Sequence, residues 1–108
     1  METIEIKNIY GDVIFKHEAE NNTVKITVEE AVNKNVKLNR ANLANANLAN
    51  AYLQGANLAG AHLTGADLLW ANLADAVLIG ANLTDAHLEG ANLQGVKLYR
   101  TILDAASF

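Results

Sequence analysis

Apolar residues recur along most of this chain with a period of five. Every fifth residue from Leu38 to Leu103 is leucine, and the residue two positions before it is alanine in every unit from Ala41 to Ala91. Five residues rotate an α-helix by about 140°, which scatters the leucines around it, and an odd step along a strand alternates between its two faces. Each unit therefore contains its own bend, so that leucine and alanine share one interior and the chain winds around a leucine axis.

The leucines form a predicted core ladder with one rung per unit. Alanine suits a narrow second interior position, and larger residues, Val36, Val96 and Thr101, occupy it only toward the ends of the repeat. Burying a leucine contributes roughly 1.5 to 3 kcal/mol, so a charge in the middle, as in Leu73→Asp, should unfold the coil. The ladder consists of Leu43, Leu48, Leu53, Leu58, Leu63, Leu68, Leu73, Leu78, Leu83, Leu88, Leu93, Leu98 and Leu103.

The residue types within the units are as regular as the spacing of the units. From Val36 onward they read Val-Lys-Leu-Asn-Arg, then Ala-Asn-Leu-Ala-Asn twice, and they continue without a register break to Phe108. This pattern resembles the pentapeptide-repeat family, whose unit is A-(D/N)-L-x-x. The resemblance implies an all-β solenoid, a right-handed quadrilateral parallel β-helix with four units in each coil. Residues 36–108 would then make about four coils, stacked at the usual strand spacing of about 4.8 Å.

Residues 1–35 lack the five-residue period and predict a separate N-terminal cap. Alternating residues from Thr3 to Asn8 predict one strand, Gly11-Asp12 a turn, and Val13–Phe15 a second strand. A small β-hairpin is the expected result.

Residues Thr23 to Lys34 predict a short helix, in which Thr27 and Glu30 have the spacing of a capping box. The helical spacing is that of Val24, Val28, Ala31 and Val32. A stacked coil leaves bare backbone groups and apolar core at each end, so we expect this hairpin and helix to cover the first coil.

The last residue of each unit is typical of a tight corner, because it is usually glycine, asparagine or aspartate. Trp70 occupies this position beside Leu69 and is expected to project outward. Two readings stay open: the indole lies on neighbouring aliphatic groups, or it contacts a partner. The candidate partner contact consists of Leu69, Trp70, Val77 and Ile79.

The C-terminal coil predicts a second contact surface. The repeat runs to Phe108, itself in an interior position, with no capping helix after it. The final coil is therefore expected to be apolar and unpaired, and two copies would cover each other through a two-fold, tail-to-tail contact. The resemblance implies the same pairing, since family members pair through their C-terminal coils. The candidate dimer end consists of Leu98, Tyr99, Ile102, Leu103 and Phe108.

No residue cluster predicts a reaction, a cofactor or a metal. His62 and His87 lie 25 residues apart and so fall on adjacent faces of a four-sided coil. Asp67, His87 and Ser107 stack at twenty-residue spacing, but parallel side chains on a flat face offer neither a cleft nor an oxyanion hole. Glycines occur singly, so no phosphate-binding loop is present, and cysteine is absent.

Charge and hydropathy narrow the classes of partner. The net charge is −4, and the repeat contributes −1 from five acids against four bases, so no basic face for direct nucleic-acid binding is expected. Family members that protect DNA gyrase from quinolones are thought to imitate acidic duplex DNA, a comparison this repeat meets only in part. No apolar run is long enough to span a membrane, and the N-terminus lacks the features of a secretion signal, so a cytoplasmic location is expected.

Together these observations predict a non-enzymatic structural module that presents a rigid surface to an unidentified protein partner. A DNA-mimicking modulator of gyrase is the alternative.

Overall fold

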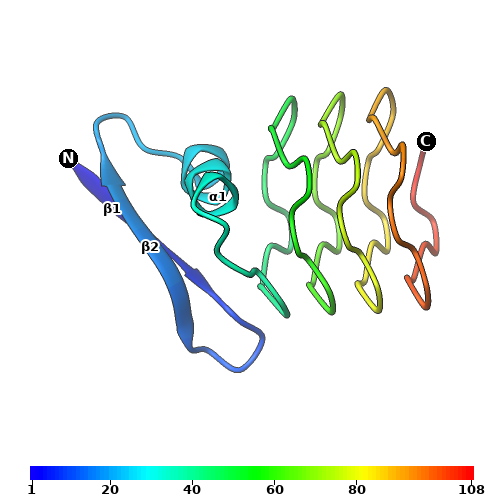
Figure 1. Ribbon diagram of the computed structural model, residues 1–108, viewed down its shortest axis with the longest axis horizontal. Helices are drawn as coiled ribbons and strands as arrows, with labels where there is room; N and C mark the ends of the chain where they lie inside the picture. The colour runs from blue at the N-terminus through cyan, green and yellow to red at the C-terminus, as the bar shows by residue number, and fades with distance from the viewer.

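A computed structural model describes residues 1–108. A hairpin of β1 (Glu2–Lys7) and β2 (Val13–Ala19) is followed by α1 (Val24–Asn33), and the rest of the chain winds as a column beyond them (Figure 1). The hairpin and α1 lie together at one end of this column, and the C-terminus lies at the other. The predicted hairpin and helix are confirmed, with β2 extending four residues beyond the predicted Phe15.

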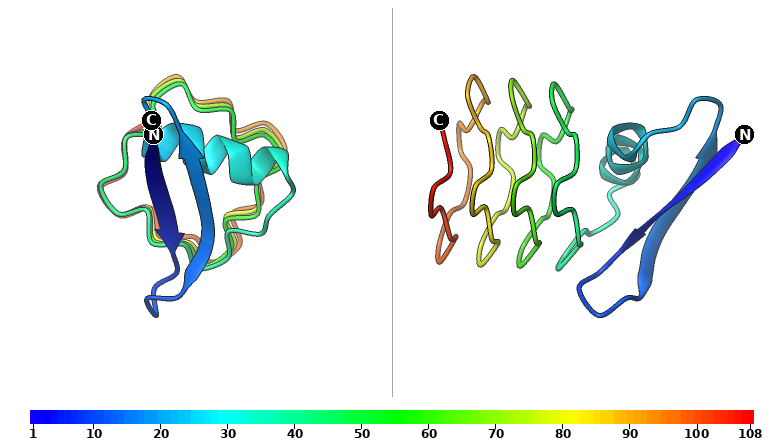
Figure 2. Two further views of the ribbon diagram at one scale, coloured as in Figure 1. Left: turned by 90° about the vertical axis from the view of Figure 1, so that its left-hand side faces the viewer. Right: turned by 180° about the vertical axis from the view of Figure 1, so that it is seen from behind.

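The column consists of twenty-residue coils that are bonded to one another as parallel strands. Bridges join residues twenty apart, such as Asn42 with His62 and His62 with Asn82. Three backbone hydrogen bonds hold each side of a coil to the next, as from His62 N to Ala41 O (2.9 Å), Leu43 N to His62 O (2.8 Å) and Asn45 N to Thr64 O (2.8 Å). Seen along the column, the coils superpose in a four-sided outline (Figure 2).

Each unit turns the chain with the same four-residue bend. In the unit around Leu43, the N–H of Ala46 donates to the carbonyl of Leu43 at 3.1 Å, and Asn45 between them has a φ of 60°. A positive φ at the third residue of the turn is typical of a type II bend and favours glycine or asparagine. The predicted corner positions all have positive φ, and Trp70 at φ 59° is among them.

Asparagine at the second position of a unit belongs to the same turn. Its Oδ1 accepts the N–H of the residue two positions later, as from Ala74 N to Asn72 at 3.0 Å. Asp67 does the same for Leu69 N at 3.0 Å. The bond recurs at every asparagine or aspartate in this position: Asn42, Asn47, Asn57, Asp67, Asn72, Asn82 and Asn92. These side chains therefore stabilise the coil itself.

The leucine ladder forms a closed core through most of the column and opens at its C-terminal end. Every ladder leucine from Leu43 to Leu88 is at most 3% exposed. Leu93 and Leu103 are half-buried, and Leu98 is 41% exposed. The leucine core is therefore closed over the first two and a half coils, whereas the last coil, from Leu93 to Phe108, presents apolar side chains to solvent.

The cap is held together by a pair of buried polar residues, Asn22 and Thr27. Asn22 donates to the carbonyl of His17 at 2.8 Å and accepts the hydroxyl of Thr27 at 3.1 Å, which ties β2 to α1. The predicted capping box at Thr27 is wrong. Thr23 caps the helix by accepting the N–H of Ile26 at 3.1 Å, and Thr27 lies inside the helix with no exposed surface.

Candidate interaction surfaces

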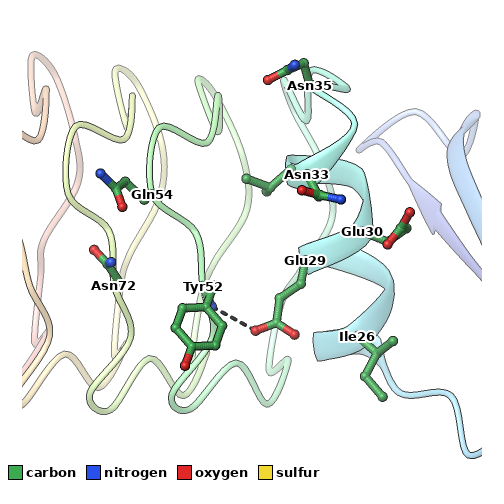
Figure 3. Close-up of a pocket in the computed structure, with 9 residues that line it drawn as sticks. Ile26, Glu29, Glu30, Asn33, Asn35, Tyr52, Gln54 and Asn72 are labelled. Atoms are coloured by element: carbon green, nitrogen blue, oxygen red, sulfur yellow. Dashed lines mark hydrogen bonds between the residues drawn. The ribbon is translucent and has the colours of Figure 1, made fainter.

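A cleft of about 580 Å³ separates α1 from one side of the column (Figure 3). The carboxylate of Glu29 accepts the backbone N–H of Tyr52 at 2.8 Å across it. In the next coil the equivalent N–H, that of Asn72, donates to the carbonyl of Ala51 in the coil before it. Tyr52 has no coil before it on this side, and the Glu29 carboxylate takes the place of that carbonyl. The neighbouring Glu30 pairs with Lys34 at 3.5 Å. Both carboxylates thus have partners within the chain, and the cleft offers no free charged group.

The candidate partner contact divides between two opposite corners of the coil. Leu69 and Trp70 form the corner that follows Leu68, whereas Ile79 lies two turns further along, at the diagonally opposite corner. Val77 lies on the side that leads to Ile79. The four residues therefore do not make one patch, because nine residues are close to half of a twenty-residue coil.

Trp70 packs along the column rather than standing alone. A methyl group at Gly90, one coil further on, would overlap the indole ring. Trp70 nevertheless keeps 69% of its surface exposed. The indole therefore lies over Gly90 and still exposes most of its surface, and contact with a partner through it stays a prediction.

The last coil gathers the most exposed apolar surface of the column. Leu98, Tyr99, Ile102 and Phe108 are 41%, 66%, 44% and 63% exposed. The guanidinium of Arg100 lies 5.2 Å from the centre of the Tyr99 ring, within the range of a cation–π contact.

The backbone of this coil is also unpaired on its outer edge. The N–H groups of Leu73, Leu78 and Leu83 donate to the carbonyls of Asn92, Lys97 and Ile102 in the following coil. The same groups of Leu93, Leu98 and Leu103 have no partner within the chain. The edge therefore combines free donors with exposed apolar side chains, the combination that promotes strand pairing.

The stacked Asp67, His87 and Ser107 do not form a triad. The carboxylate of Asp67 accepts the N–H of Leu69, while the hydroxyl of Ser107 donates to Glu89 at 3.0 Å. Since a hydroxyl has one proton, the contact of 3.2 Å between His87 Nδ1 and Ser107 Oγ has histidine as the donor. Histidine in this arrangement does not act as a base toward serine, so the cluster holds no activated nucleophile.

Hydrogen bonds at the Glu89 carboxyl change its acidity. Its own backbone N–H and then the Ser107 hydroxyl hold the pKa of the Glu89 carboxyl below its usual value, because both stabilise the ionised form.

No group of three or more histidine, cysteine, aspartate or glutamate side chains lies close enough to hold a metal ion. None of the helices has the length and apolar character needed to cross a membrane.

Comparison with known proteins agrees with the five-residue geometry. The family model for pentapeptide repeats matches residues 34–68 and 71–108 in eight copies. The chain belongs to the pentapeptide-repeat family. No protein with curated annotation is significantly similar to it in sequence.

Three solved pentapeptide-repeat proteins of cyanobacteria are similar to the chain. Rfr23 of Cyanothece 51142 is 41% identical over 67% of this chain and 59% of its own, with a TM-score of 0.44. HetL of Nostoc sp. PCC 7120, involved in heterocyst differentiation regulation, is 36% identical over 66% and 38%, with a TM-score of 0.33. The protein alr5209 of Nostoc PCC 7120 is 30% identical over 73% and 74%, with a TM-score of 0.35. The chain thus spans less than two thirds of the length of the first two.

Proposed function

We propose that this protein is a non-enzymatic interaction module, a right-handed β-helical column whose last coil binds another protein. For the 108-residue chain, the partner is a second copy in a tail-to-tail dimer. The observation that carries the proposal is the coincidence, on one coil, of exposed Leu98, Ile102 and Phe108 with unpaired backbone donors.

A two-fold contact suits this edge for a physical reason. A strand edge exposes both donors and acceptors, so two copies of the same edge can pair in opposite directions and satisfy both. Each apolar side chain then meets an apolar partner instead of water, at about 25 cal/mol for each Å² that is buried. A closed two-fold pair also covers both C-terminal edges, so this contact does not continue into a fibre.

The test is the mass of the protein in solution at tens of micromolar, by sedimentation velocity or light scattering. We expect wild type at twice the 11.6 kDa chain mass, and Phe108→Asp at the chain mass. Tyr52→Asp is the matched control, because Tyr52 is 74% exposed but lies on the first coil. Circular dichroism reports that each variant is folded. A monomeric wild type, or a Tyr52→Asp variant that dissociates as Phe108→Asp does, overturns the proposal.

The gyrase-directed alternative has no specific observation in its favour. Asp85 and Asp104 lie on one corner of the column, while Asp75 lies on the diagonally opposite corner and is followed one coil later by Gly95. A DNA mimic requires negative charge in a continuous row at phosphate-like intervals. The acids of this column form no such row.

A further inference from the structure

The cap leaves one side of the first coil open. The four sides of this coil begin at Ala41, Ala46, Ala51 and Ala56. The first receives β1, since Asn42 N donates to Lys7 O at 2.8 Å. The third receives α1, through Glu29 and Tyr52 N. The fourth receives residues 36–40, since Leu38 N donates to Asn57 O at 2.9 Å.

The second side, residues 46–50, has no such partner. The N–H of Asn47 and the carbonyls of Asn47 and Ala49 make no hydrogen bond within the chain. Burial gives the same result independently. Among the alanines that stand first in their five-residue units, from Ala41 to Ala86, Ala46 alone is not buried.

A groove of about 710 Å³ lies over this open side. Ile6 of β1 and Val24 of α1 contribute apolar walls from the cap, and Leu43 and Ala46 contribute apolar surface from the coil. Glu5 and Lys25 are the charged residues among those that line it. The groove therefore combines an apolar surface with an unpaired strand edge.

The neighbouring coils show which chemistry this edge accepts. One coil further on, Asp67 N donates to Ala46 O at 2.9 Å, while Asp67 O and Leu69 O accept from Leu48 N and Asn50 N, each at 2.8 Å. On the open side the equivalent groups are Asn47 N, Asn47 O and Ala49 O. A ligand must offer one acceptor followed by two donors, at alternate residues of an extended chain. A polypeptide backbone running parallel to residues 46–50 presents that order.

We propose that this groove binds an extended peptide segment of a partner protein, which adds to residues 46–50 as a parallel strand with three backbone hydrogen bonds. Val28 and Ala31 of α1 already fill the end of the core with no exposed surface, so the inward residue of the peptide is small. This binding mode uses the N-terminal end of the column and is independent of the dimer at the C-terminal end.

A proline substitution tests the backbone edge of residues 46–50 separately from the rest of the coil. Asn47→Pro removes an N–H that has no partner in the chain, and proline is tolerated at such edges. It also removes one side-chain bond, from Ala49 N to Asn47 Oδ1 at 3.2 Å. Asn57→Pro is the matched control: its N–H is also unpaired, and it loses the same kind of bond, from Ala59 N at 3.2 Å, on a different side of the coil.

The probe is a displayed library of random ten-residue peptides selected against the 108-residue protein, followed by fluorescence anisotropy with the selected peptides. We expect Asn47→Pro to weaken binding by about tenfold, the loss of one backbone hydrogen bond, and Asn57→Pro to leave it nearly unchanged. In wild type, the Asn47 amide should exchange rapidly with solvent and become protected when peptide is added.

Three results overturn the proposal. The library enriches no peptide above a selection without protein, or its peptides bind Asn47→Pro as tightly as wild type. Alternatively, the Asn47 amide is protected without peptide in a concentration-dependent manner, which assigns the groove to a second copy of the chain.

Discussion

Substituting Gly90 by alanine tests how side chains at the corners pack along the column. The added methyl overlaps the indole of Trp70, and residue 90 has a φ of 72°. Gly80 is the matched control, because its φ is 69° and an added methyl meets nothing within 4 Å. Both variants suffer the strain of alanine in the left-handed region, about 1 kcal/mol. Only Gly90→Ala also displaces the indole.

The additional loss of stability in Gly90→Ala, compared with Gly80→Ala, comes from apolar surface of the indole that becomes exposed to water. Trp70 is 69% exposed, so about a third of its surface is covered. A large aromatic residue buries about 200 Å² when fully enclosed, so the covered third contributes about 1.5 kcal/mol at 25 cal/mol per Å². We expect Gly80→Ala to lower the free energy of unfolding by about 1 kcal/mol and Gly90→Ala by about 2.5 kcal/mol.

Urea unfolding followed by circular dichroism measures both values, and the fluorescence of the single tryptophan reports the indole directly. In Gly90→Ala the emission should shift to the red, since the ring moves into water. In a Trp70→Gly background, Gly90→Ala should cost only as much as Gly80→Ala costs in wild type. Equal losses in Gly80→Ala and Gly90→Ala, with unchanged emission, refute the reasoning.

Three further outcomes are expected. Leu73→Asp, at a position with no exposed surface, should abolish the circular dichroism of the folded state, whereas Leu98→Asp, at a position 41% exposed, should stay folded; equal behaviour of the two contradicts an open last coil. The Glu89 carboxyl has a lowered pKa in the folded state, so its contribution to stability is present above the unfolded pKa and is lost as the pH falls through the folded one. Ser107→Ala should raise the Glu89 midpoint in an NMR titration, and an unchanged midpoint contradicts the hydroxyl contact. In a supercoiling assay with purified gyrase, tens of micromolar protein should neither inhibit the enzyme nor protect it from a quinolone, and either effect restores the DNA-mimic alternative.

The five-residue period was sufficient to predict the coil because its physical cause is local. A leucine step that fits neither helix nor strand requires a bend in each unit, and the glycine and asparagine positions locate that bend. The four-sided coil that the resemblance implies separates Trp70 from Ile79, since nine residues are nearly half of a twenty-residue coil. The sequence therefore contained the signal that divides the candidate contact, although apolar character alone suggested one patch.

The contacts between the cap and the column could not be predicted in this way. Glu29 and Tyr52 are 23 residues apart, and neither residue type at either position indicates the other. The helix start was ambiguous because Thr23 and Thr27 both precede apolar residues. The position of Asn22 determines where the helix starts, because its side-chain amide accepts the hydroxyl of Thr27 and so holds Thr27 inside the helix. Asn22 is in turn held by the carbonyl of His17, whose place depends on β2. The groove over Ala46 depends on the same placement.

The corner side chains all lean the same way along the column, which the five-residue period alone does not show. A side chain at a left-handed corner leans toward the next coil, so that an added methyl at Gly60, Gly65 or Gly95 would touch Arg40, Asn45 or Asp75, twenty residues earlier. The consequence is a packing rule along each corner. The two longest corner side chains that have a coil after them follow it: Arg40 is followed one coil later by Gly60, and Trp70 by Gly90.

Gly80 shows the converse of this rule. The residue twenty positions earlier is Gly60, which has no side chain to lean, and the space around Gly80 is empty. Glycine at Gly80 is therefore required only by its backbone φ, and asparagine, which tolerates that φ, should replace it at little cost. Glycine at Gly90 is required by the backbone and by the indole together. Corner glycines of this column thus have two separable causes, and the residue one coil earlier decides which of them applies.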